Sequence, residues 1–193
     1  MSLDLVVSEL AEQLWSEESF PAANSLQAIA ATDTEESSRA WNVLVEALME
    51  GGLDVSLKSS QALAYYGASG GEDRLDEVLQ VYRRALESRG EETRFAVVDG
   101  LRMILQLDPG ATEKVVPVLG EALEHGFGEL VEKSEEAGSV AELSRRDVWS
   151  DRSLRDVFNT LVEATDHDVE GVKQVIGDDE VAFFIDACFD KGR

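Results

Sequence analysis

The chain offers few side chains for catalysis or metal binding: two histidines, His125 and His167, and a single cysteine, Cys188. His125 lies in EALEHGFG, where a polar ring followed by glycine is typical of the end of a helix. His167 lies between two aspartates in ATDHDVEG, and an aspartate there is more typical of a helix N-cap than of a metal ligand. Cys188 lies on the apolar stripe of VAFFIDACFD, which indicates a small buried side chain. The sequence has no nucleophile elbow, phosphate-binding loop or dinucleotide fingerprint, so we expect no enzyme activity, no metal and no cofactor.

Arginines, whose forked guanidinium recognises carboxylates and phosphates, gather at two places in the chain. The first group is Arg83, Arg84, Arg89, Arg94 and Arg102. The second group surrounds a tryptophan and consists of Arg145, Arg146, Trp149, Arg152 and Arg155. Because tryptophan and arginine are common in the energetic centres of protein interfaces, we predict that these residues, Arg89 apart, bind a partner protein. The alternative is local ion pairing, of Arg94 with Glu91 or Asp99 and of Arg152 with Asp156.

The elements that position these side chains are predicted to be helices almost throughout. Apolar residues recur at steps of three and four, as in the series Leu75, Val78, Leu79, Tyr82 and Leu86, and no segment alternates long enough for a strand. Glycine-rich breakers at 51–52, 67–71, 90, 108–110, 125–128 and 138 indicate turns between the helices. Pro117 lies inside one stripe, so it either marks a first turn beginning near Val116 or kinks the helix. The fold class is therefore predicted to be all-α.

Short connections make successive helices antiparallel neighbours, so the helices can be paired. We predict the pairs 34–50 with 53–66, 71–89 with 91–107, 111–125 with a segment beginning near Gly128, and 151–164 with 168–176 and 178–190. In a single domain spanning 1–193, residues 1–33 would be N-terminal capping helices, 34–164 the helix-pair repeats and 165–193 the C-terminal capping helices. Stacked pairs of this length form solenoids.

Two stretches share a pattern, LDVSLKSSQALAYYG at 53–67 and EETRFAVVDGLRMIL at 91–105. The first contains an acidic turn, then Leu57-Lys58, small residues, Ala62-Leu63 and a glycine; the second repeats Thr93-Arg94, Val97-Val98 and Leu101 without the glycine. This pattern resembles the second helix of HEAT repeats, and the resemblance covers residues 34–107. It implies antiparallel helix pairs stacked as a short HEAT-like solenoid that binds other proteins. An irregular helical bundle is the alternative.

The charge balance is strongly acidic, with 40 Asp and Glu against 17 Lys and Arg and a formal net charge of −23. Only five of the cations are lysines, and this composition is typical of cytoplasmic proteins in salt-accumulating halophiles. Affinity for nucleic acid depends on neutralising phosphates, so we expect no direct binding of nucleic acid. The sequence has no apolar run long enough for a bilayer and no signal-peptide pattern, so no membrane association is expected. A single cysteine fits a reducing cytoplasm.

These patterns together predict a non-enzymatic protein-binding scaffold or adaptor of the helical-repeat type, from a halophile, whose partner is another protein. The alternative is a small all-α regulatory protein whose acidic surface mimics nucleic acid or docks a basic partner. The oligomeric state is not fixed by the sequence.

Overall fold

The computed structural model describes residues 2–16, 19–32, 34–88, 90–136, 151–166 and 169–176. These residues form helices joined by turns and contain no strand, which confirms the all-α fold class. None of the helices in the described residues is both long and apolar enough to cross a membrane. The chain divides into two compact units, 1–111 and 112–193, and each is described by itself.

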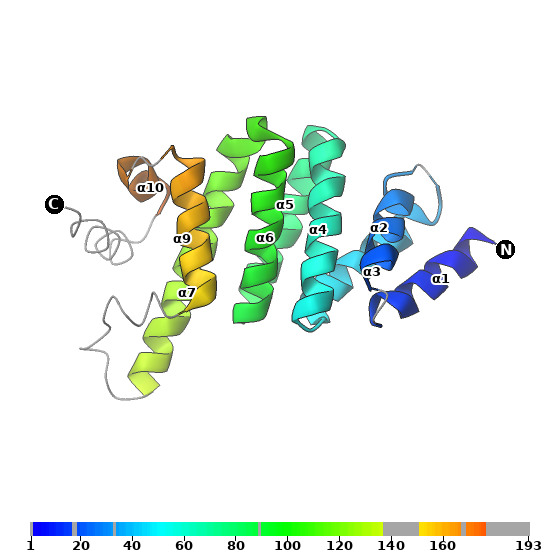
Figure 1. Ribbon diagram of the computed structural model, residues 1–193, viewed down its shortest axis with the longest axis horizontal. Coiled ribbons are helices and arrows are strands. Elements are labelled where there is room, and N and C mark those ends of the chain that lie inside the picture. The colour runs from blue at the N-terminus through cyan, green and yellow to red at the C-terminus, as the bar shows by residue number, and fades with distance from the viewer. Residues whose placement is uncertain are drawn as a thin grey trace. The chain divides into compact units, whose positions relative to one another are not determined.

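The first unit contains the following helices, shown in Figure 1: α1 (Leu3–Leu14), α2 (Ser19–Ala30), α3 (Ser37–Glu50), α4 (Leu53–Ser69), α5 (Glu72–Ser88), α6 (Glu91–Leu107) and a 3-10 turn at Pro109–Ala111. Helix α4 packs against both α2 and α6, and α3 packs against both α1 and α5. The helices therefore lie in two layers, which we name the first-helix layer (α1, α3, α5) and the second-helix layer (α2, α4, α6). The predicted pairs 34–50 with 53–66 and 71–89 with 91–107 are confirmed as α3–α4 and α5–α6.

Small side chains let α4 and α6, the most extensively packed pair of helices, approach one another closely. Ser60 on α4 and Gly100 on α6 are buried, and the fully buried Tyr82 of α5 lies beside both. The Tyr82 hydroxyl donates to the Ser60 carbonyl (2.7 Å) and accepts from the Ser60 hydroxyl (3.1 Å). A Cβ at position 100 would overlap Tyr82 Oη and Ser60 Oγ, so glycine is required by the packing there.

A second cluster joins both layers near the C-terminal end of α2. The Arg74 guanidinium lies 4.7 Å from the centroid of the Tyr66 ring, and its Nη2 donates to the carbonyl of Ala31 at 2.9 Å. The ring of Trp41 also packs against Tyr66, with 4.9 Å between the two ring centroids. These contacts connect α3, α4, α5 and the residue that follows α2, so they help to fix the register of the two layers.

The second unit contains α7 (Thr112–Glu136), α9 (Arg152–Ala164) and α10 (Val169–Val175). Helix α9 packs against α7, and α10 contacts both of them. Helix α9 begins one residue after the predicted start at 151: Asp151 is its N-cap, and the Asp151 carboxylate accepts from the main-chain N–H of Leu154 at 3.0 Å. The turn expected at Gly138, the segment 178–190 and the cysteine Cys188 lie outside the described residues.

Helix α7 corrects three expectations from the sequence. The turn predicted at 125–128, with a second helix beginning near Gly128, is wrong, because α7 is one continuous helix through this region. His125 is therefore an exposed residue inside the helix and not at its end. The apolar spacing Leu123, Phe127, Leu130 continues at steps of four and three, and it outweighs a cost of about 1 kcal/mol for each glycine. Pro117 is the sixth residue of α7, so a helix start near Val116 is also wrong.

Candidate protein-binding groove

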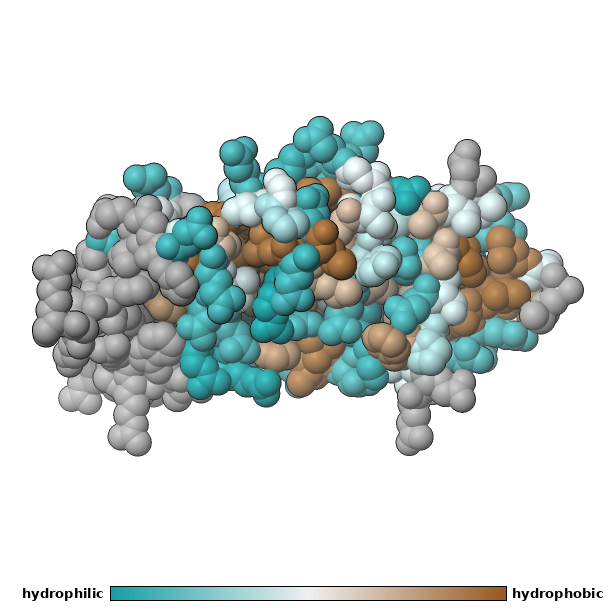
Figure 2. Space-filling view, turned by 45° about the horizontal axis from the view of Figure 1, so that its top comes forward, coloured by the Kyte–Doolittle hydropathy of each residue, from teal (hydrophilic) through white to brown (hydrophobic). Residues whose placement is uncertain are grey.

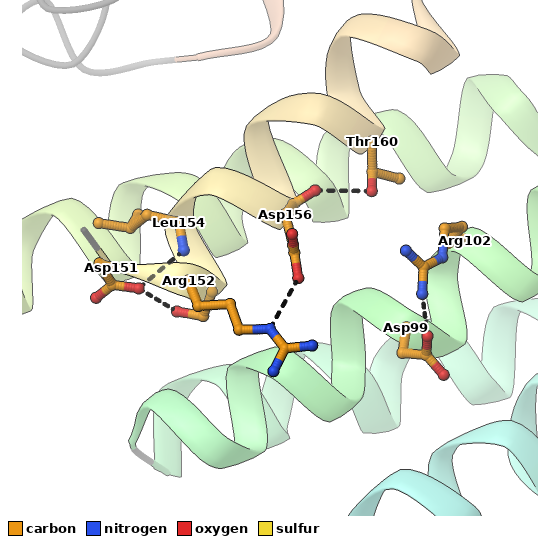
Figure 3. A network of polar contacts seen from close by, with 8 residues as sticks. Asp99, Arg102, Asp151, Arg152, Leu154, Asp156 and Thr160 are labelled. Atoms are coloured by element: carbon orange, nitrogen blue, oxygen red, sulfur yellow. Dashed lines mark hydrogen bonds and ion pairs between the residues drawn. The ribbon is translucent and has the colours of Figure 1, made fainter. Parts of the chain in front are cut away.

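The arginines that the sequence singled out are not gathered in one site. Arg145, Arg146 and Trp149 lie outside the described residues. Arg152 and Arg155 are exposed on α9, and Arg152 makes the local ion pair that was the alternative to partner binding: its Nε lies 3.9 Å from Asp156 Oδ2 (Figure 3). A pair this exposed, with 70% of the Arg152 side chain accessible, contributes little to stability.

The first arginine group separates into buried and exposed members. Arg84 is exposed, and Arg83 is half-buried and engaged in an interaction. Arg94 is only 2% exposed, because it falls on the same stripe of α6 as the buried Val98 and Leu101. Arg94 therefore does not offer its guanidinium to a partner at the surface, which removes it from the predicted binding residues.

Arg102 lines a hollow in the surface. This hollow, which we name the α2–α4–α6 groove, has a volume of about 510 Å³ and is formed by all three helices of the second-helix layer. Its lining residues are Phe20, Asn24, Gln61, Tyr65, Asp99, Arg102, Met103 and Gln106.

Helical spacing explains why these residues share one surface. Phe20 and Asn24 on α2 are four residues apart, as are Gln61 and Tyr65 on α4, so each pair lies on one face of its helix. The lining residues of α6 lie at positions 99, 102, 103 and 106, where neighbours three or four residues apart share one face of the helix. The apolar stripes of the same helices point inward to the core, so the groove consists of the opposite, outward stripes.

Asp99 connects several of the polar residues that line the groove. Its carboxylate accepts from Gln61 Nε2 at 2.8 Å, which joins α4 to α6, and it pairs with Arg102 three residues further along α6 (Figure 3). The Asp99 side chain is 15% exposed and that of Arg102 is 44% exposed. A guanidinium carries five N–H donors, and within the described residues Asp99 is the acceptor it contacts. Arg102 is therefore held in place in the lining of the groove and has further N–H donors that Asp99 does not use.

The lining of the groove also includes two exposed aromatic rings. Phe20 is 51% exposed and Tyr65 is 49% exposed, and Met103 is half-buried beside them in the lining. Hydrophobic side chains reach the surface among hydrophilic ones in Figure 2. Aromatic side chains left at the surface of a concave site, next to an arginine, have the composition of an interface centre.

Charge is distributed unequally between the two layers. Helix α2 contains no charged residue, and the two charged residues of α4, Asp54 and Lys58, pair with each other. The second-helix layer as a whole contains four acids and three bases, whereas the first-helix layer, of similar size, contains ten acids and four bases. The formal charges are therefore −1 and −6. The excess of acidic residues therefore lies in the first-helix layer and not in the layer that forms the groove.

No family model matches the chain, and no curated protein matches it. Within the described residues, no group of three or more His, Cys, Asp or Glu side chains is arranged to hold a metal ion.

Of the eight lining residues, Arg102 alone was among the binding residues predicted from the sequence, and the other seven were not predicted. One signal was present in the sequence: the segment 19–30 has no charge in a chain of which 30% is charged, and it places a phenylalanine on its polar stripe. This uncharged segment departs from the average composition of the chain. The groove residues of α4 and α6 show no such departure, and they are brought beside α2 by the fold.

Proposed function

We propose that the chain is a non-enzymatic protein-binding scaffold or adaptor that holds a partner protein at the α2–α4–α6 groove. The observation that carries the proposal is the charge difference between the layers. If high salt alone had selected the acidic surface, exposed positions in both layers would carry acids. The second-helix layer is instead nearly neutral and exposes two aromatic rings, as a surface that another protein covers would be.

The layered pairs support the further proposal that residues 34–107 form a short HEAT-like array. A stack of this kind presents its second helices as one continuous surface, which fits the use of that layer for binding. The acidic excess and the scarcity of lysine support an origin in the cytoplasm of a halophile.

Site-directed photo-crosslinking tests the proposed binding surface. A benzophenone amino acid placed at Tyr65 in the groove is compared with one placed at Leu5 on α1, since the two side chains are 49% and 48% exposed. Crosslinking in a native high-salt extract should give a discrete adduct from position 65 and none from position 5.

The opposite result supports a different function. An adduct from position 5 alone would place the partner on the acidic first-helix layer, as the nucleic-acid-mimic alternative predicts, and would refute the groove as the binding surface.

A further inference from the structure

We propose that the α2–α4–α6 groove takes an extended, uncharged peptide segment of the partner protein. The inference rests on the proposed function and specifies the occupant of the same site. It follows from the shape of the groove, from its hydrogen-bonding groups and from its charge.

The shape of the groove favours a protruding chain segment. A hollow of about 510 Å³ between helices needs an occupant that enters it, and a second copy of this chain would present the same hollow face. Two such copies would also bring together two net charges of −23. A segment that leaves the surface of a partner and lies along the groove meets neither difficulty.

The hydrogen-bonding groups of the groove match a peptide main chain. Asn24, Gln61 and Gln106 line it, and an amide side chain has both donors and an acceptor, like the peptide group itself. Gln61 uses its Nε2 on Asp99, so its carbonyl oxygen is the group that can accept from a main-chain N–H. Arg102 has further N–H donors for main-chain carbonyls. Main-chain recognition of this kind requires an extended segment, since a helix satisfies its own N–H and C=O groups.

The charge of the groove excludes an ionic occupant. Asp99 and Arg102 are the charged residues of the lining, and they pair with each other. A lysine or glutamate side chain buried there would lose its water without gaining a free counter-charge. Apolar side chains, in contrast, would cover Phe20, Tyr65 and Met103 and remove their surface from water.

An uncharged occupant has a distinctive salt dependence. Contacts between opposite charges at a surface are screened as ionic strength rises, because the Debye length falls to about 3 Å at 1 M salt. Contacts between apolar groups and between main chain and amides do not depend on this screening. The affinity of the groove for its segment should therefore be retained at high salt.

Selection of peptides on the full-length protein tests the occupant directly. A library of displayed random dodecapeptides is selected against the protein in about 2 M KCl, and enriched sequences are synthesised with a fluorescent label for polarisation binding assays. The enriched peptides should have uncharged centres with one or two apolar side chains. Their dissociation constants should change by less than about threefold between about 0.2 M and about 2 M KCl.

Two variants matched in exposure locate the binding. Tyr65→Ala should weaken peptide binding by about tenfold or more, as the loss of an aromatic anchor does. Leu5→Ala removes an equally exposed side chain on α1 and should leave the dissociation constant within about twofold. Circular dichroism of both variants should equal that of the wild type, because both side chains are at the surface.

Two outcomes would overturn the inference. Enrichment of Lys- and Arg-rich peptides whose affinity falls steeply with KCl would show that charge selects the occupant. Absence of any peptide whose binding depends on Tyr65 would show that an extended segment is not the occupant. In either case an adduct at position 65 that maps to a folded domain of a partner would leave the proposed function standing.

Discussion

Replacing Gly100 by alanine tests how closely α4 and α6 approach each other. Helix propensity alone favours the change by about 1 kcal/mol, because Gly100 lies inside α6. The new Cβ would, however, overlap Tyr82 Oη and Ser60 Oγ and lie 2.8 Å from Tyr82 Cζ. Tyr82 is fully buried and cannot swing into solvent.

The expected cost has two parts. Forcing a methyl group into a packed site costs about 1–3 kcal/mol, and breaking the buried hydrogen bonds between Tyr82 and Ser60 costs about 1–3 kcal/mol. After the gain in helix propensity, we expect the free energy of unfolding to fall by about 3 kcal/mol. Urea unfolding followed by far-UV circular dichroism and tryptophan fluorescence measures the change as a lower midpoint.

Gly128→Ala is the matched control. Gly128 is an exposed residue inside α7, and a Cβ built there meets nothing within 4 Å. The same substitution should therefore raise stability by about 1 kcal/mol. Adding Ser60→Ala to Gly100→Ala should recover part of the loss, because it removes one of the two overlapping oxygens. A Gly100→Ala protein as stable as the wild type would refute the close approach of α4, α5 and α6.

Three further predictions follow from other contacts. Arg74→Met should lower the free energy of unfolding in urea by about 1–3 kcal/mol, because it removes both the cation over the Tyr66 ring and the hydrogen-bond donor to the Ala31 carbonyl. An unchanged urea midpoint would show that these contacts do not stabilise the fold. Pro117→Ala should raise the melting temperature in calorimetry, because exposed Pro117 deprives the interior of α7 of a main-chain donor; a lower melting temperature would show that the proline is required. Burial raises the pKa of Tyr82 above its usual value, so the unfolded state loses the phenol proton first, and the free energy of unfolding should fall as the pH rises above about 10. Tyr82→Phe should reduce this fall in urea unfolding at alkaline pH. An equal fall in the wild type and the variant would show that another group causes the alkaline sensitivity.

The sequence was sufficient to predict the helices within residues 37–107, because their apolar residues recur at regular steps of three and four. It was misleading where glycine was taken as the end of a helix. Gly67 lies inside α4, and a Cβ there would lie 3.1 Å from a methyl group of Val78, so this glycine serves packing against α5. Gly128 lies inside α7, and a Cβ built there meets no atom within 4 Å. A glycine in a periodic segment indicates a turn only when the apolar spacing also stops there.

The groove could not be predicted from the same periodicity. Apolar spacing identifies the stripe of a helix that faces the core, and the groove is made of the opposite stripes of α2, α4 and α6. Which outward stripes lie side by side depends on the order of helices in the layers, and this order emerges from packing between elements distant in sequence. Arg94 and Arg102 illustrate the limit: both are arginines of α6, yet one is buried and the other lines the groove.

The position of the acidic residues, more than their number, distinguishes a surface that is solvated at high salt from a surface that binds a partner. Acids that serve solvation are needed wherever the surface meets water, and they would be harmful wherever a partner excludes water, because burying them costs desolvation. The first-helix layer carries the excess of acids, while the second-helix layer pairs Asp54 with Lys58 and Asp99 with Arg102. Because Asp54 and Asp99 are each paired within their own helix, a partner that covers them does not desolvate a lone charge. Under the proposed function, the acidic surface and the neutral groove have one common explanation: the first-helix layer keeps the chain solvated at high salt, and the second-helix layer is left for the partner to cover.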